Sequence, residues 1–64
     1  MKGYIYNVET NVIVAIIIGD NNSTIENKAN DLGYMGVDEY GLSYSDSGLE
    51  ELTSTEIFEA ETDG

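Results

Sequence analysis

The chain has 64 residues, with thirteen Asp or Glu against two Lys or Arg, a formal net charge of −11, and neither Cys nor His. This charge argues against direct binding to nucleic acid or to an anionic membrane, because both require a basic protein surface. Without Cys or His there is no structural zinc site, and the usual general base and the strongest nucleophile are missing. A chain of this length forms a single domain, residues 1–64, with little stability to spare. Its end, residues 60–64, is expected to fray.

Residues 3–18 predict a β-hairpin, because Tyr, Ile and Val dominate on both sides of a polar break. If Thr10–Asn11 form a two-residue turn, Val8 pairs with Ile13, whereas a three-residue loop would give another register. The second strand, 12–18, is apolar on both faces. It should therefore be central in the sheet, or be covered on one face by something other than a single helix. The same run is far too short to span a bilayer.

One helix should follow the hairpin. Ser23 and Glu26 fit a capping box at its start, and Gly33 is placed to end it in a left-handed conformation. Apolar residues recur at helical spacing and form one stripe: Ile25, Ala29 and Leu32. A helix of this length covers one side of a small sheet.

Two further strands are predicted after the helix. Tyr40–Tyr44 is a short strand candidate, 45–52 reads as a loop with possible helical turns, and 53–60 reads as a final strand with Ile57 and Phe58 on opposite sides. A C-terminal helix is the rival, but a charged residue breaks its apolar stripe. The predicted fold is α+β, a small antiparallel sheet with one helix packed on one face in the order β-β-α-β-β.

Catalysis, metal binding and cofactor binding are not expected. Glu50 and Glu51 are adjacent, so on a strand they point to opposite faces and do not converge as a catalytic pair. The best EF-hand alignment starts at Asp20 and lacks the essential glycine. A looser oxygen-ligand site around Asp46, Glu50 and Glu51 remains open, but a solvated acidic loop is the favoured interpretation. Neither a P-loop nor a G-x-G-x-x-G motif is present.

Negative charge concentrates in the second half of the chain, where residues 37–64 hold nine Asp or Glu and no Lys or Arg. This bias exceeds what solubility requires, and self-repulsion destabilises a small domain. We therefore predict a surface that imitates the charge of nucleic acid and binds a basic DNA-binding protein. Tyrosines among the carboxylates suit contacts with arginine or lysine. The predicted contact residues are Asp38, Glu39, Asp46, Glu50, Glu51, Glu56 and Glu59, with Tyr40 and Tyr44 in support.

The stretches YIYNVETNVIVAIIIGD and NDLGYMGVDEYGLSY, within residues 3–44, resemble small acidic proteins of phages and mobile elements. Anti-CRISPR inhibitors, including some directed against type I systems, are among these proteins. The resemblance implies stoichiometric binding to a basic Cas subunit in the cytoplasm of a bacterial host, without chemistry. It is one of general pattern and transfers no functional residue.

The alternative is a structural or assembly protein that forms a homodimer through the exposed side of its sheet. The two-sided apolar strand 12–18 motivates this hypothesis. Charge reversal at Glu50 and Glu51 should abolish inhibition and leave assembly intact, whereas a charge at Ile16 or Ile17 should do the opposite.

Overall fold

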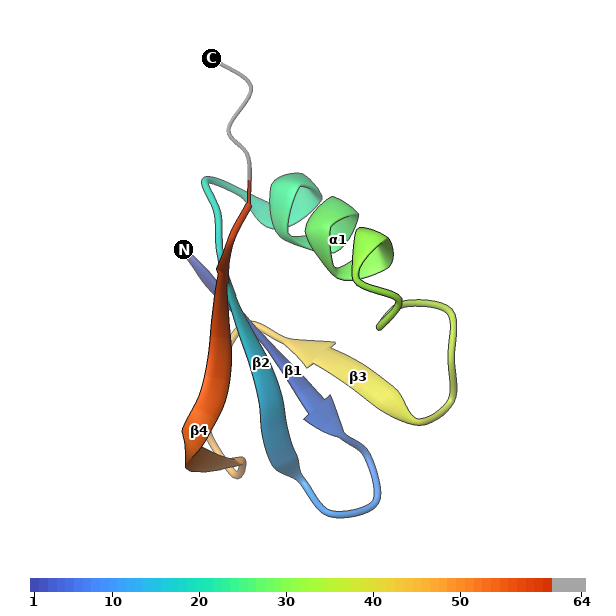
Figure 1. Cartoon of the computed structure of the whole chain (residues 1–64), viewed down its shortest axis with the longest axis vertical. Coiled ribbons are helices and arrows are strands. Elements are labelled where there is room, and N and C mark those ends of the chain that lie inside the picture. Colours follow the sequence, from blue (N-terminus) through green and yellow to red (C-terminus); the bar gives the residue numbers. More distant parts are fainter. Residues whose placement is uncertain (61–64) are drawn as a thin grey trace.

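The structure, a computed structural model, describes residues 1–60. Its elements are β1 (Lys2–Asn7), β2 (Val12–Ile18), α1 (Asn22–Asp31), β3 (Tyr40–Ser43) and β4 (Glu50–Glu59). The four strands form one sheet in the order β3-β1-β2-β4, and α1 packs on one face of it (Figure 1). The predicted β-β-α-β-β order and the α+β class are confirmed. No helix among the described residues is long and apolar enough to cross a membrane.

The sheet is mixed, whereas a wholly antiparallel sheet was expected. The pairs β1–β2 and β1–β3 are antiparallel, but β2 and β4 are parallel. After β3 the chain does not turn back on itself: residues 44–49 cross the sheet to its other edge, on the face opposite α1 (Figure 1). There Glu50 donates its N–H to Asn11 O, at 2.9 Å, beside the hairpin loop. Six extended residues span up to about 20 Å, enough for this crossing.

The hairpin loop is longer than predicted. It comprises Val8–Asn11, and the proposed two-residue turn at Thr10–Asn11 is wrong. The side chain of Asn7 starts the loop early, because its oxygen accepts the N–H groups of Glu9 and Thr10. Asn11 closes it with φ 59°, a left-handed conformation that asparagine tolerates well.

This loop changes the pairing of β1 with β2. Tyr6 lies opposite Ile13 and Ile5 opposite Ala15, so Val14 is left as a bulge between them. The predicted pair of Val8 with Ile13 does not form. β2 nevertheless lies between β1 and β4, as its two-sided apolar character predicts.

The N-cap of the helix lies two residues earlier than predicted. Asn21 is the N-cap, and its side-chain oxygen accepts the N–H of Thr24 at 3.0 Å, so the capping box of Ser23 with Glu26 does not form. Gly33, with φ 84°, follows the helix in the left-handed conformation, as predicted.

The main core lies between α1 and the sheet. Its anchor is Ile25, fully buried above Gly3 and Gly19; a Cβ added at Gly3 would overlap the Ile25 side chain. Ala60 is also buried, and it donates its N–H to Ile18 O at 2.8 Å. Of the residues expected to fray, 60–64, only Ala60 is described, and it packs and pairs with the sheet; residues 61–64 lie outside the described part. The buried cluster comprises Ile5, Ala15, Ile17, Ile25, Ala29 and Ala60.

The opposite face of β2 is covered as well. Ile13 and Ile16 point to this face and are only 0% and 4% exposed. The crossing segment, residues 44–49, passes over it, with Leu49 half-buried. β2 thus has α1 on one face and the crossing segment on the same side of the sheet as its other face.

Candidate protein-interaction surface

Every carboxylate side chain among residues 1–60 is exposed, and none is buried against backbone amides. All of these side chains are therefore accessible to a partner, although Glu39 and Glu26 also interact with the nearby hydroxyls of Tyr40 and Tyr44. This includes each acidic residue predicted as a contact: Asp38, Glu39, Asp46, Glu50, Glu51, Glu56 and Glu59.

Two backbone hydrogen bonds gather part of this charge at one end of the molecule. Val8 donates its N–H to Glu39 O at 3.1 Å, and Glu50 donates to Asn11 O at 2.9 Å. The segments entering β3 and β4 are thereby fixed on either side of the hairpin loop. We call the acidic residues of these three segments the hairpin-end cluster: Glu9, Asp38, Glu39, Glu50 and Glu51.

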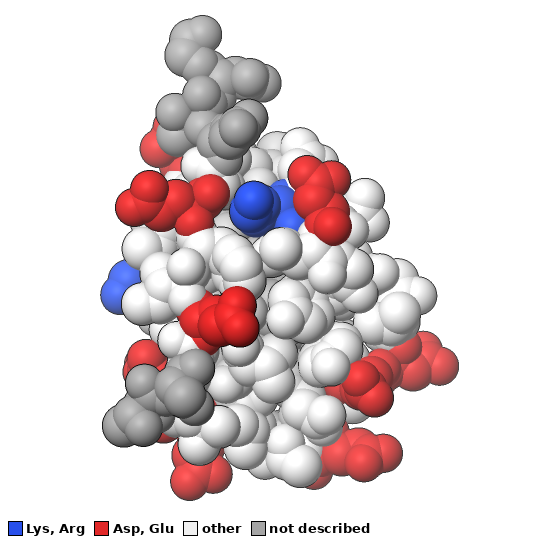
Figure 2. Space-filling model, in the orientation of Figure 1, with Lys and Arg blue, Asp and Glu red and all other residues white. Residues whose placement is uncertain are grey.

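The two lysines lie away from the hairpin-end cluster. Lys2 begins β1, opposite Ile18, and therefore stands at the other end of the sheet. Lys28 lies in α1. In Figure 2 acidic side chains lie at both the upper and the lower end of the molecule, and the basic ones lie above its lower end. The hairpin-end cluster is therefore a one-sign surface that extends its negative potential into solvent.

Three predicted acidic contacts do not join this cluster. Glu56 lies opposite Ala15 on the α1 side of the sheet, and Glu59 lies opposite Ile18 at the far end of β4. Asp46 is in the crossing segment, where its backbone carbonyl accepts the N–H of Leu49. The structure thus divides the predicted set instead of placing it on one continuous face.

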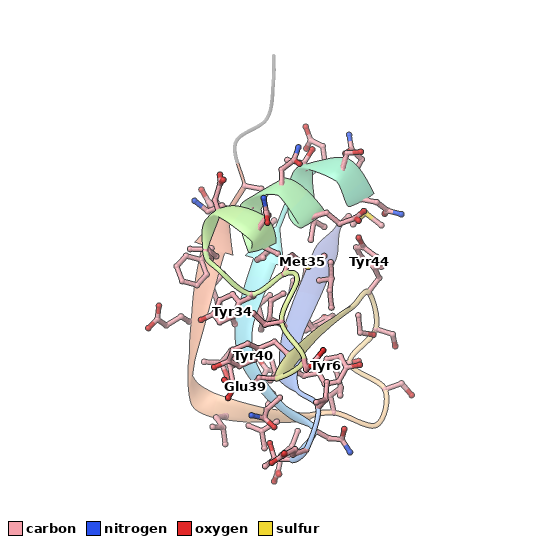
Figure 3. The ribbon with its side chains drawn as sticks, turned by 90° about the vertical axis from the view of Figure 1, so that its right-hand side faces the viewer. Tyr6, Tyr34, Met35, Glu39, Tyr40 and Tyr44 are labelled. Atoms are coloured by element: carbon pink, nitrogen blue, oxygen red, sulfur yellow. The ribbon has the colours of Figure 1, made fainter. Side chains whose placement is uncertain are left out.

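Tyr40 connects the cluster to the core. Its ring meets that of Tyr34 edge to face, with centroids 5.0 Å apart and planes at 82° (Figure 3). A hydrogen bond with the Glu39 carboxylate, together with the charge of that group, raises the pKa of Tyr40. Tyr40 and Glu39 thus place an aromatic ring and a carboxylate side by side at the surface, an arrangement that suits a guanidinium group.

Tyr44 belongs to a different part of the surface. It is 39% exposed, and burial followed by the charge of Glu26 raises its pKa. Because Glu26 is on α1, Tyr44 lies beside the helix and away from the hairpin-end cluster (Figure 3).

Sequence reasoning missed Glu9 and the exposed Ile57. The predicted set was drawn from the acidic second half of the chain, although the hairpin prediction itself placed Glu9 at the loop. Ile57, at 63% exposure, is the most exposed large apolar side chain of the described residues. Its exposure depends on β4 being an edge strand, which the local pattern does not reveal.

Residues 1–60 contain no group of three or more acidic side chains placed to hold a metal ion. One depression runs along α1, and it is lined by polar side chains without a nucleophile and base in contact: Asp20, Asn21, Ser23, Thr24, Asn27, Lys28 and Asp31.

No family model, curated protein or solved structure matches the chain.

Proposed function

We propose that this chain is a non-enzymatic inhibitor that binds stoichiometrically to the DNA-binding surface of a basic protein in a bacterial cytoplasm. Its carboxylates take the positions that phosphates would occupy. The observation that carries the proposal is the hairpin-end cluster, whose side chains are all exposed and have no lysine beside them.

The magnitude of the charge supports competition with DNA. The molecule is 36 Å long, and a duplex of that length carries about 21 negative charges at one per 1.7 Å. The chain carries a net charge of −11, about half that density. Such a body is attracted over a long range to a basic groove, and salt weakens the attraction.

Tyr40 and Glu39 add a directional contact to this general attraction. A carboxylate accepts paired hydrogen bonds from an arginine, and the face of a neighbouring aromatic ring attracts the same cation. Arginine is common in DNA-binding surfaces, because its planar guanidinium also matches phosphate. The resemblance to anti-CRISPR inhibitors makes a basic Cas subunit the first partner to test.

Homodimerisation through the sheet has less support. Ile16 and Ile17, whose exposure would motivate it, are 4% and 0% exposed within the single chain. A charge placed at either position is expected to unfold the domain and so does not report on assembly.

The proposal is tested by capture from a CRISPR-bearing bacterial lysate with the tagged protein, washed in rising salt and competed with duplex DNA. We expect one basic DNA-binding protein or complex, released between low and moderate salt and displaced by the duplex. Recovery of the chain alone at every salt concentration would contradict the proposal.

A matched pair of variants locates the contact. The test variant neutralises part of the hairpin-end cluster: Asp38→Asn, Glu50→Gln and Glu51→Gln. The control removes the same number of charges elsewhere: Asp20→Asn, Glu26→Gln and Asp31→Asn. Capture should be lost in the first and retained in the second. Equal losses would mean that net charge alone determines binding.

A further inference from the structure

β4 is an edge strand whose outer side pairs with no other described strand. Its first half is irregular, because residues 52–55 oppose only Val14 of β2. The Thr55 hydroxyl closes this bulge: it donates to Ile13 O and accepts the N–H of Leu52. Bulges protect an edge from unwanted pairing. Residues 56–59 form the regular part that follows, here called the β4 edge.

The backbone groups that the β4 edge presents can be worked out from one hydrogen bond. Ala60 donates its N–H to Ile18 O at 2.8 Å, so its N–H points toward β2. Backbone groups alternate sides along a strand, and therefore Phe58 also bonds to β2. Ile57 and Glu59 consequently direct their N–H and C=O groups outward, giving two donors and two acceptors.

The side chains beside these groups combine an apolar contact with negative charge. Ile57 is 63% exposed, while Phe58, on the opposite face, packs against the core. Glu59 lies on the same face as Ile57, and Glu56 comes directly before Ile57 in the chain. Both glutamates are exposed. No Lys or Arg follows Lys28 in the chain.

We propose that an extended, basic segment of the partner protein adds to the β4 edge as a fifth strand. Ile57 contacts an apolar side chain of that segment, and Glu59 pairs with a lysine or arginine. Charge complementarity selects this occupant, because a second copy of the chain brings the same glutamates and a net charge of −11. The inference rests on the proposed function and names one of its contacts.

The test uses an eight-residue peptide of alternating lysine and valine, with affinity measured by calorimetry and amide exchange by NMR. Binding should slow exchange at Ile57 and Glu59. The matched control peptide has proline in place of each valine, which keeps the charge but cannot extend a sheet. It should bind at least tenfold more weakly.

A pair of variants tests the same edge from the protein side. Ile57→Pro removes an outward N–H without touching the bonds to β2, and should weaken peptide binding about tenfold or more. Ile57→Val keeps both the N–H and an apolar side chain and should bind as the wild type does. If Ile57→Pro fails to fold, the proline control peptide still tests strand addition, because it is measured with the wild-type protein.

Two results would overturn the inference. Equal binding of both peptides, without protection at Ile57 and Glu59, would show attraction by charge alone. If the protein is a dimer and these amides are protected without peptide, the β4 edge pairs with a second copy of the chain and not with a basic segment. Failure of the proposed function can be told apart from failure of this inference. The hairpin-end variant should lose capture of the partner from the lysate but still bind the peptide at the β4 edge.

Discussion

Replacing Ile25 by alanine should remove a large part of the stability of this domain. Ile25 is fully buried, and it fills the space that Gly3 and Gly19 leave between α1 and the sheet. An Ile→Ala change at such a site costs about 2–5 kcal/mol, the lost transfer energy plus the cavity left behind. A domain of 64 residues has about 3–10 kcal/mol in total, at roughly 0.05–0.15 kcal/mol per residue.

We therefore expect Ile25→Ala to lose about 3 kcal/mol and to melt about 12–24 °C lower, at roughly 4–8 °C per kcal/mol for this size. Urea unfolding followed by far-UV circular dichroism measures the first quantity, and a thermal scan the second. Ile57→Ala is the control, since the same side chain is 63% exposed there and should change stability by less than about 1 kcal/mol. A loss below 1 kcal/mol for Ile25→Ala would refute the packing of α1 described above.

Three other predictions concern the helix, the aromatic contact and the net charge. Asn21→Ala should lower the free energy of unfolding in urea by about 1 kcal/mol, because Asn21 is the N-cap, and Ser23→Ala should lower it much less. A larger loss for Ser23→Ala would mean that Ser23 caps the helix, as the capping box predicts. The pKa of Tyr40 is raised above 10.0 in the folded state, so ionisation of Tyr40 lowers the stability of the domain only as the pH rises past that value. Glu39→Gln should lower this pKa in a spectrophotometric titration of the tyrosines. An unchanged titration curve would show that Glu39 does not contact Tyr40. Moderate NaCl should raise the melting temperature, because salt screens the repulsion behind a net charge of −11; a fall would point to stabilising ion pairs instead.

Local patterns predicted the elements but not every pairing between them. The apolar character of 12–18 on both faces required a central strand, and Gly33 marked the end of the helix; both are observed. The direction of β4 depends on where residues 44–49 cross the sheet, which is a property of tertiary packing. The hairpin register depended on Asn7 capturing two loop amides, an interaction that competes with a tighter turn.

The candidate site was predictable in its chemistry more than in its layout. Exposed carboxylates near Tyr40 follow from the composition of the second half of the chain. Their division between the hairpin-end cluster and the far end of β4 does not, because it follows from the parallel placement of that strand. Glu9 joins the cluster only through the bonds that bring β3 and β4 to the hairpin loop.

The most direct test of the central claim is a displacement titration with the captured basic protein and labelled duplex DNA. We expect the wild-type chain to release the duplex competitively, with an affinity that falls as salt rises. The variant with Asp38→Asn, Glu50→Gln and Glu51→Gln should fail to release it at the same concentrations. A ternary complex, in which the chain and the duplex occupy the protein together, would contradict the claim.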